Sequence, residues 1–362
     1  MSIKLTVLWS ALASYNVAFF RELAFTHGFR IQLIHQKATR EAPYAPFDLS
    51  FCDSVLEDVP GKRLQLQALI GTFGPDAVLM ISWNFPHFMR IARRLRRRGV
   101  YVVAAMDNQW SGGPKQYLGI LASPIYLWLS IDNFLVPGSS QACFARKLGY
   151  PNVWYGYAAA DIDCYRRQVP VTSRQQSFLF IGRLVRVKNI VGLNQAYQIY
   201  RSRTEEPWPL KIVGAGPLSA ELDGIPGIQA LGFVQPAELP NVMNSAQCLV
   251  LPSLVEPWGV VIQEAAAAGL PLIATYRCGA ASRYIHSGVN GYVVGHRPQE
   301  IATAMIRMSQ KSEAELLAMS RASTEIARSW TPSKLASYFA SRLRECLQQT
   351  SETGLPANSF AS

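Results

Sequence analysis

The sequence lacks any uninterrupted apolar run long enough to cross a membrane, and its cysteines form no metal or disulfide pattern. No stretch of the 362 residues reaches the roughly 18 apolar positions of a transmembrane helix. The six cysteines are scattered without a C-x-x-C pair, and the five histidines have no metal or catalytic-triad spacing. We therefore expect reduced structural thiols in a cytoplasmic protein that binds no metal.

Two shorter apolar segments need another interpretation. The first, near the N-terminus, has only Lys4 as a basic flank, so we expect a strand, a loop and an amphipathic helix there rather than a signal peptide. The second, YLGILASPIYLWLSI at positions 117–131, is interrupted by Pro124. It is too short to span a bilayer and predicts a helix that is either buried or interfacial.

Acidic residues are few, and the basic excess is concentrated in one segment. The chain has 35 Lys and Arg against 24 Asp and Glu, which gives a net charge of +11. Within NFPHFMRIARRLRRRG, apolar residues recur at helical spacing among six arginines, which predicts an amphipathic basic helix. Either its apolar side packs inward with the arginines in water, or Arg94, Arg97 and Arg98 dock on anionic lipid head groups at the inner face of a membrane. Nucleic-acid binding is disfavoured because the helix lacks interleaved aromatic residues.

The order of strand and helix signals predicts an α/β protein with two domains. Apolar residues make up 49% of the chain, enough for two cores at this length. We expect one Rossmann-like unit at 1–165, a polar linker at 166–177 and a second unit at 178–330. A helix at 331–349 should return to the first unit, and the tail at 350–362 is rich in Ser, Thr, Gly and Pro, which predicts disorder.

Two glutamates eight positions apart, Glu256 and Glu264, are the most informative feature of the second unit. Glu256 precedes a proline and should therefore lie in a loop, while Pro257 should open a helix. The unpartnered amides of that first turn favour an anion, and Gly259 allows a close approach. Over about 12 Å of helix, the two carboxylates can bracket a diphosphate.

This segment resembles the E-x7-E motif of the retaining glycosyltransferases of family 4, and the resemblance extends from about Phe178 to Val294. It implies the GT-B fold, in which two Rossmann-like domains have parallel sheets facing a cleft. The stretch GRLVRVKN resembles the family's G-R-L-x-x-x-K-N element. That likeness implies that Gly182 forms the turn while Arg183 and Lys188 neutralise the diphosphate of a nucleotide-sugar donor.

The resemblance also implies roles for the glutamate segment. Glu256 should hold the hydroxyls of the donor sugar, Glu264 the ribose hydroxyls, and the backbone at Gly259 and Val260 the diphosphate. With two cations and a helix end available, neither a metal nor another cofactor is expected. The D-x-D sequence at Asp161 is discounted because it falls at the domain junction. The acceptor should be a hydroxyl of a glycan or a lipid-linked glycan.

The sequence departs from the family pattern in the first unit. The loop after the first strand, SALASYNVAFF, has no glycine, and Asp107 stands where many members carry a histidine. Asp107 either accepts a hydroxyl proton or holds a sugar, acting with Glu256, Arg183 and Lys188 in catalysis, or it is a helix or turn cap at the end of its strand. In the family, the loop around LGFV lies near the nucleobase, so Phe233 is either a base contact or a buried strand residue.

Two alternatives stay open at this point. A GT-B sugar-nucleotide epimerase or hydrolase would bind the same donor and would use Asp107 as an acid or base. A non-catalytic protein at the membrane surface would keep a vestigial donor pocket and act through its arginine helix. Because Glu256, Arg183, Lys188 and Glu264 are all present, we favour the transferase.

Overall fold

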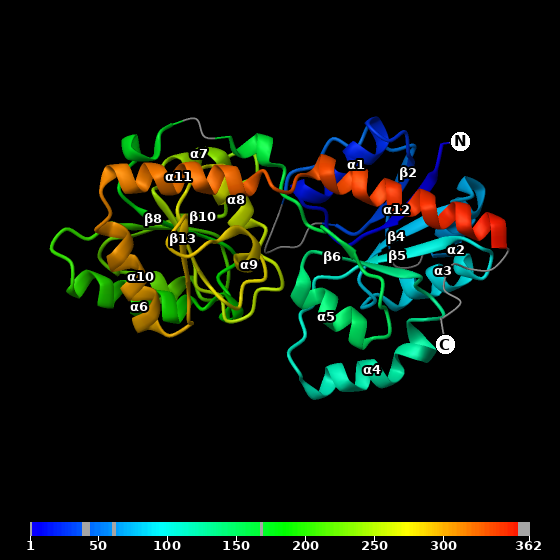
Figure 1. Cartoon of the computed structure of the whole chain (residues 1–362), viewed down its shortest axis with the longest axis horizontal. Coiled ribbons are helices and arrows are strands. Elements are labelled where there is room, and N and C mark those ends of the chain that lie inside the picture. The colour runs from blue at the N-terminus through cyan, green and yellow to red at the C-terminus, as the bar shows by residue number, and fades with distance from the viewer. Residues whose placement is uncertain (1, 38–43, 60–62, 167–168, 354–362) are drawn as a thin grey trace. The chain divides into compact units, whose positions relative to one another are not determined.

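The computed structural model describes residues 2–37, 44–59, 63–166 and 169–353, which form two compact units. Unit 1 contains the described residues of 1–39, 46–159 and 332–362, and unit 2 those of 40–45 and 160–331. Each unit has one parallel sheet with helices packed against it (Figure 1). Most of the tail for which disorder was predicted lies outside the described residues.

The sheet of unit 1 has seven parallel strands in the order β3-β2-β1-β4-β5-β6-β7. In chain order the strands are β1 (Lys4–Leu8), β2 (Arg30–His35), β3 (Ser54–Glu57), β4 (Ala77–Ile81), β5 (Tyr101–Ala105), β6 (Asn133–Val136) and β7 (Trp154–Tyr155). The central strand β1 pairs on both sides, with Leu5 opposite Ile31 and Ala77. Its residues after Lys4 are buried, as expected of a parallel strand covered on both faces.

Six α-helices complete the described part of unit 1. They are α1 (Ser14–Phe25), α2 (Arg63–Phe73), α3 (Pro86–Arg96), α4 (Pro114–Tyr126), α5 (Ser139–Lys147) and α12 (Pro332–Thr353). The long helix α12 packs on α1, where the rings of Phe19 and Phe339 meet edge to face at 5.6 Å. The aromatic contact explains why α12 clusters with unit 1, although it follows unit 2 in the sequence.

The arginine helix α3 packs its apolar side inward as the periodicity predicts. Phe88, Ile91 and Leu95 are buried, while Arg94, Arg97 and Arg98 are exposed. One arginine does not lie in water as expected, because Arg96 Nε donates to the buried carboxylate of Asp132 at 2.8 Å. Burial raises the pKa of Asp132, and Arg96 opposes that shift. The pair therefore fixes α3 to the sheet.

One histidine of α3 has a buried carboxylate partner. His87 lies in the first turn of α3, and its Nε2 is 2.7 Å from Asp58 Oδ2. Both side chains are largely buried. The sequence could not show this contact because Asp58 follows β3, 29 positions earlier.

The sheet of unit 2 has six parallel strands in the order β10-β9-β8-β11-β12-β13. They are β8 (Phe178–Ile181), β9 (Leu210–Val213), β10 (Ile228–Gly232), β11 (Cys248–Leu251), β12 (Leu272–Thr275) and β13 (Gly291–Val294). Among the described helices of this unit are α6 (Ile190–Ser202), α7 (Leu239–Asn244), α8 (Val261–Ala267), α9 (Ala281–Tyr284), α10 (Pro298–Ser309) and α11 (Glu313–Ala327). Four 3-10 helices join them, η1 (Ile162–Tyr165), η2 (Val171–Ser173), η3 (Arg186–Lys188) and η4 (Ser219–Leu222). The α/β class predicted from the sequence is confirmed.

Among the residues that the structure describes, no helix is both long enough and apolar enough to cross a membrane.

Candidate donor site

The candidate site is built where β8 ends and the chain turns into η3. Gly182 follows the strand, and Gly214 follows the neighbouring strand β9 with φ +143°. A Cβ added to Gly214 would lie 1.9 Å from the carbonyl oxygen of Gly182, so only glycine fits there. The two glycines bring the ends of adjacent strands close together, and the side chain of Lys188 lies over Gly182.

Backbone hydrogen bonds join η3 to the loop that carries Glu256. The carbonyl oxygen of Val187 accepts from the amides of Leu254 and Val255, at 2.8 and 3.2 Å. Asn189 is in the left-handed conformation, and its side-chain amide donates to the carbonyl of Pro252 at 3.1 Å. Two segments that are distant in the sequence are thus fixed to each other immediately before Glu256.

Lys188 and Glu256 form an ion pair in this position. Their side chains are only 14% and 11% exposed. Glu256 also accepts from the hydroxyl of Ser253, at 3.3 Å. Lys188 was predicted to bind the diphosphate and Glu256 the sugar, and the structure brings these two predicted residues into direct contact.

The helix after Glu256 begins later than the sequence predicts. The first residue of α8 is Val261, and Pro257 to Val260 belong to the preceding loop. Gly259 has φ +89°, which excludes it from a helix. A Cβ at this position would also lie 2.9 Å from Cγ of Glu256. The expected helical first turn at Pro257 is therefore wrong, and Gly259 and Val260 lie in a loop beside Glu256.

Glu264 lies in α8 and is 8% exposed. Burial raises the pKa of its carboxyl from about 4.5 to about 7, and a hydrogen bond with Tyr165 opposes part of this shift. The pKa of Tyr165 is raised in turn, by burial and then by the charge of Glu264. Glu264 is therefore a buried carboxyl with a phenol beside it.

Tyr44 is a residue of this site that the sequence did not reveal. Its pKa is raised by burial and by Glu264, and lowered by Arg183, so its phenol lies near both groups. Its ring lies 6.0 Å from that of Phe233, and the next amide, Ala45 N, donates to Gln235 at 3.1 Å. No sequence pattern marks Tyr44, because its contacts join positions about 190 apart.

Asp107 belongs to unit 1, whereas the residues described above belong to unit 2. It follows β5 and is half-buried. Burial raises the pKa of Tyr157, and the charges of Tyr15 and Asp107 add to the shift. The structure thus groups Asp107 with Tyr15 and Tyr157 within unit 1.

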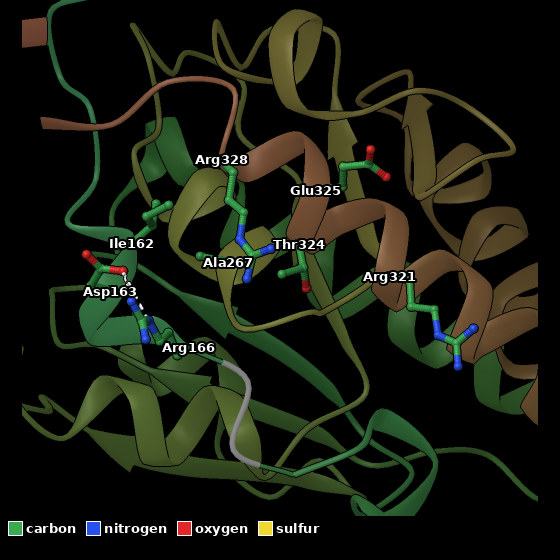
Figure 2. A pocket seen from close by; sticks show the side chains of 8 residues that line it. All are labelled: Ile162, Asp163, Arg166, Ala267, Arg321, Thr324, Glu325 and Arg328. Atoms are coloured by element: carbon green, nitrogen blue, oxygen red, sulfur yellow. Dashed lines mark hydrogen bonds and ion pairs between the residues drawn. The ribbon is translucent and has the colours of Figure 1, made fainter. Parts of the chain in front are cut away.

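A separate cavity of about 770 Å³ lies between η1 and α11 in unit 2. Figure 2 shows Asp163 paired with Arg166 at one side, while Glu325 and Arg321 point away from Arg328. The side chains do not converge on one point, and none of the predicted donor residues lines the cavity. Asp163, the second acid of the discounted D-x-D, bonds Arg166 at 2.9 Å.

Part of unit 2 is similar to a known protein family. Residues 175–311, which include every predicted donor residue, match the model of the family described as Glycosyl transferases group 1. This part of unit 2 is therefore similar to the group 1 glycosyltransferases. An uncharacterized glycosyltransferase of Methanocaldococcus jannaschii is 32% identical over 152 residues, which are 40% of this chain and 38% of that protein.

Two further proteins match over stretches of similar length. A D-inositol 3-phosphate glycosyltransferase of Arthrobacter sp. (strain FB24) is 33% identical over 151 residues, 39% of this chain and 36% of that protein. The O-antigen chain mannosyltransferase B of Escherichia coli is 28% identical over 155 residues, 40% of this chain and 35% of that protein. The chain thus matches less than two fifths of the length of these curated relatives.

Solved structures extend the likeness to both units. Sucrose-phosphate synthase from Thermosynechococcus elongatus has a TM-score of 0.73 at 14% identity, covering 96% of this chain and 100% of that one. Anabaena HepE, solved with UDP and glucose, has a TM-score of 0.72 at 15% identity, covering 95% of this chain and 100% of that one. At these identities the likeness concerns the fold alone, and the chain has the two-domain α/β architecture of the GT-B fold.

Proposed function

We propose that the protein is a retaining glycosyltransferase that moves a sugar from a nucleoside-diphosphate-sugar to a hydroxyl of a glycan or lipid-linked glycan. The observation that carries this proposal is the Lys188–Glu256 ion pair. The pair lies within the residues that match the family model. The amides of Leu254 and Val255, just before Glu256, donate to the carbonyl of Val187 and so hold Glu256 beside η3. A cation and a carboxylate fixed side by side can bind a diphosphate and the adjoining sugar hydroxyls together.

In this mechanism the bond between the anomeric carbon and the diphosphate breaks, and the acceptor oxygen bonds the same face of the sugar. Lys188 and Arg183 stabilise the negative charge that develops on the leaving diphosphate. Glu256 orients the sugar by accepting from its hydroxyls, with Lys188 and Ser253 holding the carboxylate. The leaving phosphate takes the acceptor proton, so no separate nucleophile or metal is needed.

Gly259 and Val260 contribute loop amides to the diphosphate in this proposal. Because α8 has seven residues and starts only at Val261, its dipole adds little, and the cations supply most of the stabilisation. Glu264 accepts from the ribose hydroxyls. A ligand hydroxyl would favour the ionised carboxylate, which burial alone disfavours.

The nucleobase would lie against Tyr44 and Phe233. Their rings form a tilted pair at 6.0 Å beside Glu264 and Arg183. Stacking on an aromatic ring tolerates different bases, so this pair does not select one nucleotide. UDP is the first nucleotide to test, because Anabaena HepE was solved with it.

We assign acceptor binding to unit 1. There Asp107 would accept a hydrogen bond from the acceptor hydroxyl and so orient it. For the cellular setting we propose the cytoplasm, with contact to anionic lipid through the exposed Arg94, Arg97 and Arg98 of α3. Vesicle binding should then fall with added salt and with neutralisation of these three arginines. Insensitivity to both would refute the arginine contact.

The transferase proposal is tested by donor turnover in purified protein. K188A and E256A should each abolish most sugar release from the preferred nucleotide-sugar, while the protein stays folded. If either variant keeps the parent rate, the proposed roles are wrong.

A further inference from the structure

Helix α4 of unit 1 exposes its apolar side. Leu121 and Ile125 are 76% and 75% exposed, and Tyr117, Leu118 and Leu129 around them are exposed as well. At 100° per residue these side chains fall on one face of the helix and its C-terminal extension. We call this set the α4 face. Figure 1 shows α4 at the rim of unit 1, below α5 in the view.

The inward side of α4 is less apolar than the α4 face. Gln116, Gly119 and Ser123 lie on this side. Ser123 is buried, and its hydroxyl donates to the carbonyl of Ile120 at 2.8 Å. Ile120 and Leu127 supply the main apolar contacts with the core. A helix of a globular domain normally turns its apolar stripe toward the core. Because α4 instead exposes its apolar stripe, we expect this stripe to contact an apolar partner outside the domain.

Cations lie near both ends of α4, in a part of the sequence that has few acids. Residues 77–160 contain nine Lys and Arg but only two acids, Asp107 and Asp132, and the second is buried against Arg96. Lys115 is exposed in the first turn of α4. At the other end, the charge of Arg90 lowers the pKa of Tyr126, although burial has the larger, opposite effect.

Aromatic rings lie between the cations and the aliphatic residues. Trp110 packs edge to face on Tyr117 at 5.1 Å, and Lys147 lies over the Trp110 ring at 4.9 Å. Trp128 is half-buried, and its indole donates to the carbonyl of Leu148 at 2.9 Å. Aliphatic residues bordered by aromatic rings and then by cations match the layering of a membrane interface.

We propose that the α4 face lies in the interfacial layer of an anionic lipid bilayer. A second copy of the chain is the poorer partner, since a self-complementary contact would bring Lys115 and Arg90 of two chains together. An anionic bilayer satisfies both the apolar residues and the cations. This site goes beyond the donor chemistry, and binding at it does not depend on the proposed transfer reaction.

Co-sedimentation of the full chain with vesicles tests the proposal. The vesicles are phosphatidylcholine alone or with about one third phosphatidylglycerol, and the variants are L121S/I125S and a matched control, F25S/L69S. The control removes two exposed apolar side chains of the same unit from α1 and α2. The parent and the control should bind the anionic vesicles, whereas L121S/I125S should partition about thirtyfold more weakly, which corresponds to about 2 kcal/mol for two aliphatic side chains.

Equal melting temperatures of parent and variants establish that the variants are folded. Equal binding of L121S/I125S and the parent, or failure of the parent to bind anionic vesicles, would overturn the proposal. Sedimentation velocity without lipid tests the alternative that the α4 face joins two copies of the chain. A parent dimer that becomes a monomer in L121S/I125S alone would assign the α4 face to a second copy and would also overturn it.

Discussion

Lys188 and Glu256, 68 positions apart in the sequence, form an ion pair at the end of β8. Both side chains are largely buried, so each charge depends on the other for its solvation. The pair has a surface counterpart in unit 2, Lys311–Glu315, at 2.6 Å and more exposed. The comparison of these two pairs separates a role in the donor site from the general effect of removing an ion pair.

We expect K188A and E256A each to lower kcat/KM for the donor by at least about a hundredfold, the usual effect of losing one group that stabilises transition-state charge. The double variant should lose far less than the product of the two single effects, because the residues act as a unit. K311A and E315A should keep the parent rate. Steady-state kinetics of all five variants measures this, and independent, multiplicative effects of K188A and E256A would contradict the coupling.

The raised pKa of Glu264 predicts a pH-dependent stability. Between about pH 4.5 and 7 the folded state binds more protons at this carboxyl than the unfolded state, so stability falls as pH rises and levels off above about 7. E264Q removes this slope and should be more stable than the parent at pH 8, by up to about 3 kcal/mol, but not at pH 4.5. Urea unfolding of both proteins at the two pH values measures it. An equal difference at both values would contradict the shift.

Tyr44 should contribute to nucleotide affinity rather than to the chemical step. Y44A should raise the Kd for UDP by about 5- to 150-fold, the range of about 1 to 3 kcal/mol for one stacked base. Y44F keeps the ring and should stay within about threefold of the parent. F25A removes an exposed ring of unit 1 and serves as the control. Calorimetric titration distinguishes these outcomes, and a Y44F as weak as Y44A would assign the effect to the hydroxyl instead of the ring.

Gly259 tests how closely the loop must approach Glu256. Gly259 and Gly224 both have positive φ, +89° and +70°, but only at Gly259 would a Cβ meet Glu256, at 2.9 Å. G259A and G224A should each cost about 1 kcal/mol of stability from backbone strain. Only G259A should also lower donor turnover, by at least about tenfold. Equal turnover in the two variants would show that the Glu256 side chain yields without loss.

The sequence predicted the alternation of strands and helices, because buried parallel strands such as β1 and β4 are continuous apolar runs. Two strands of unit 1 have no such run, since β3 alternates half-buried and exposed residues and β7 has two residues. The late start of α8 was missed because a proline suggests a first turn, while a glycine in the sequence does not reveal the sign of its φ.

The proposed donor residues stand in local motifs of the sequence, but the contacts between them could not be predicted from those motifs. Lys188 and Glu256 belong to separate motifs, which the parallel pairing of β8 with β11 and the hydrogen bonds at Val187 bring together. Tyr44 carries no local signal at all, since its partners Phe233 and Gln235 lie about 190 positions away. The sequence also could not show that α4 exposes its apolar face, because an apolar run does not reveal which of its faces packs on the core.

The most direct test of the donor site is the thermal stability of the parent and K188A in the presence of nucleoside diphosphates. We expect one of UDP, GDP and ADP to raise the melting temperature of the parent selectively, because it binds only the folded state. The rise should be largely lost in K188A and kept in K311A. If no nucleotide stabilises the parent, or if K188A responds as strongly as the parent does, the site proposed at Lys188 and Glu256 is wrong.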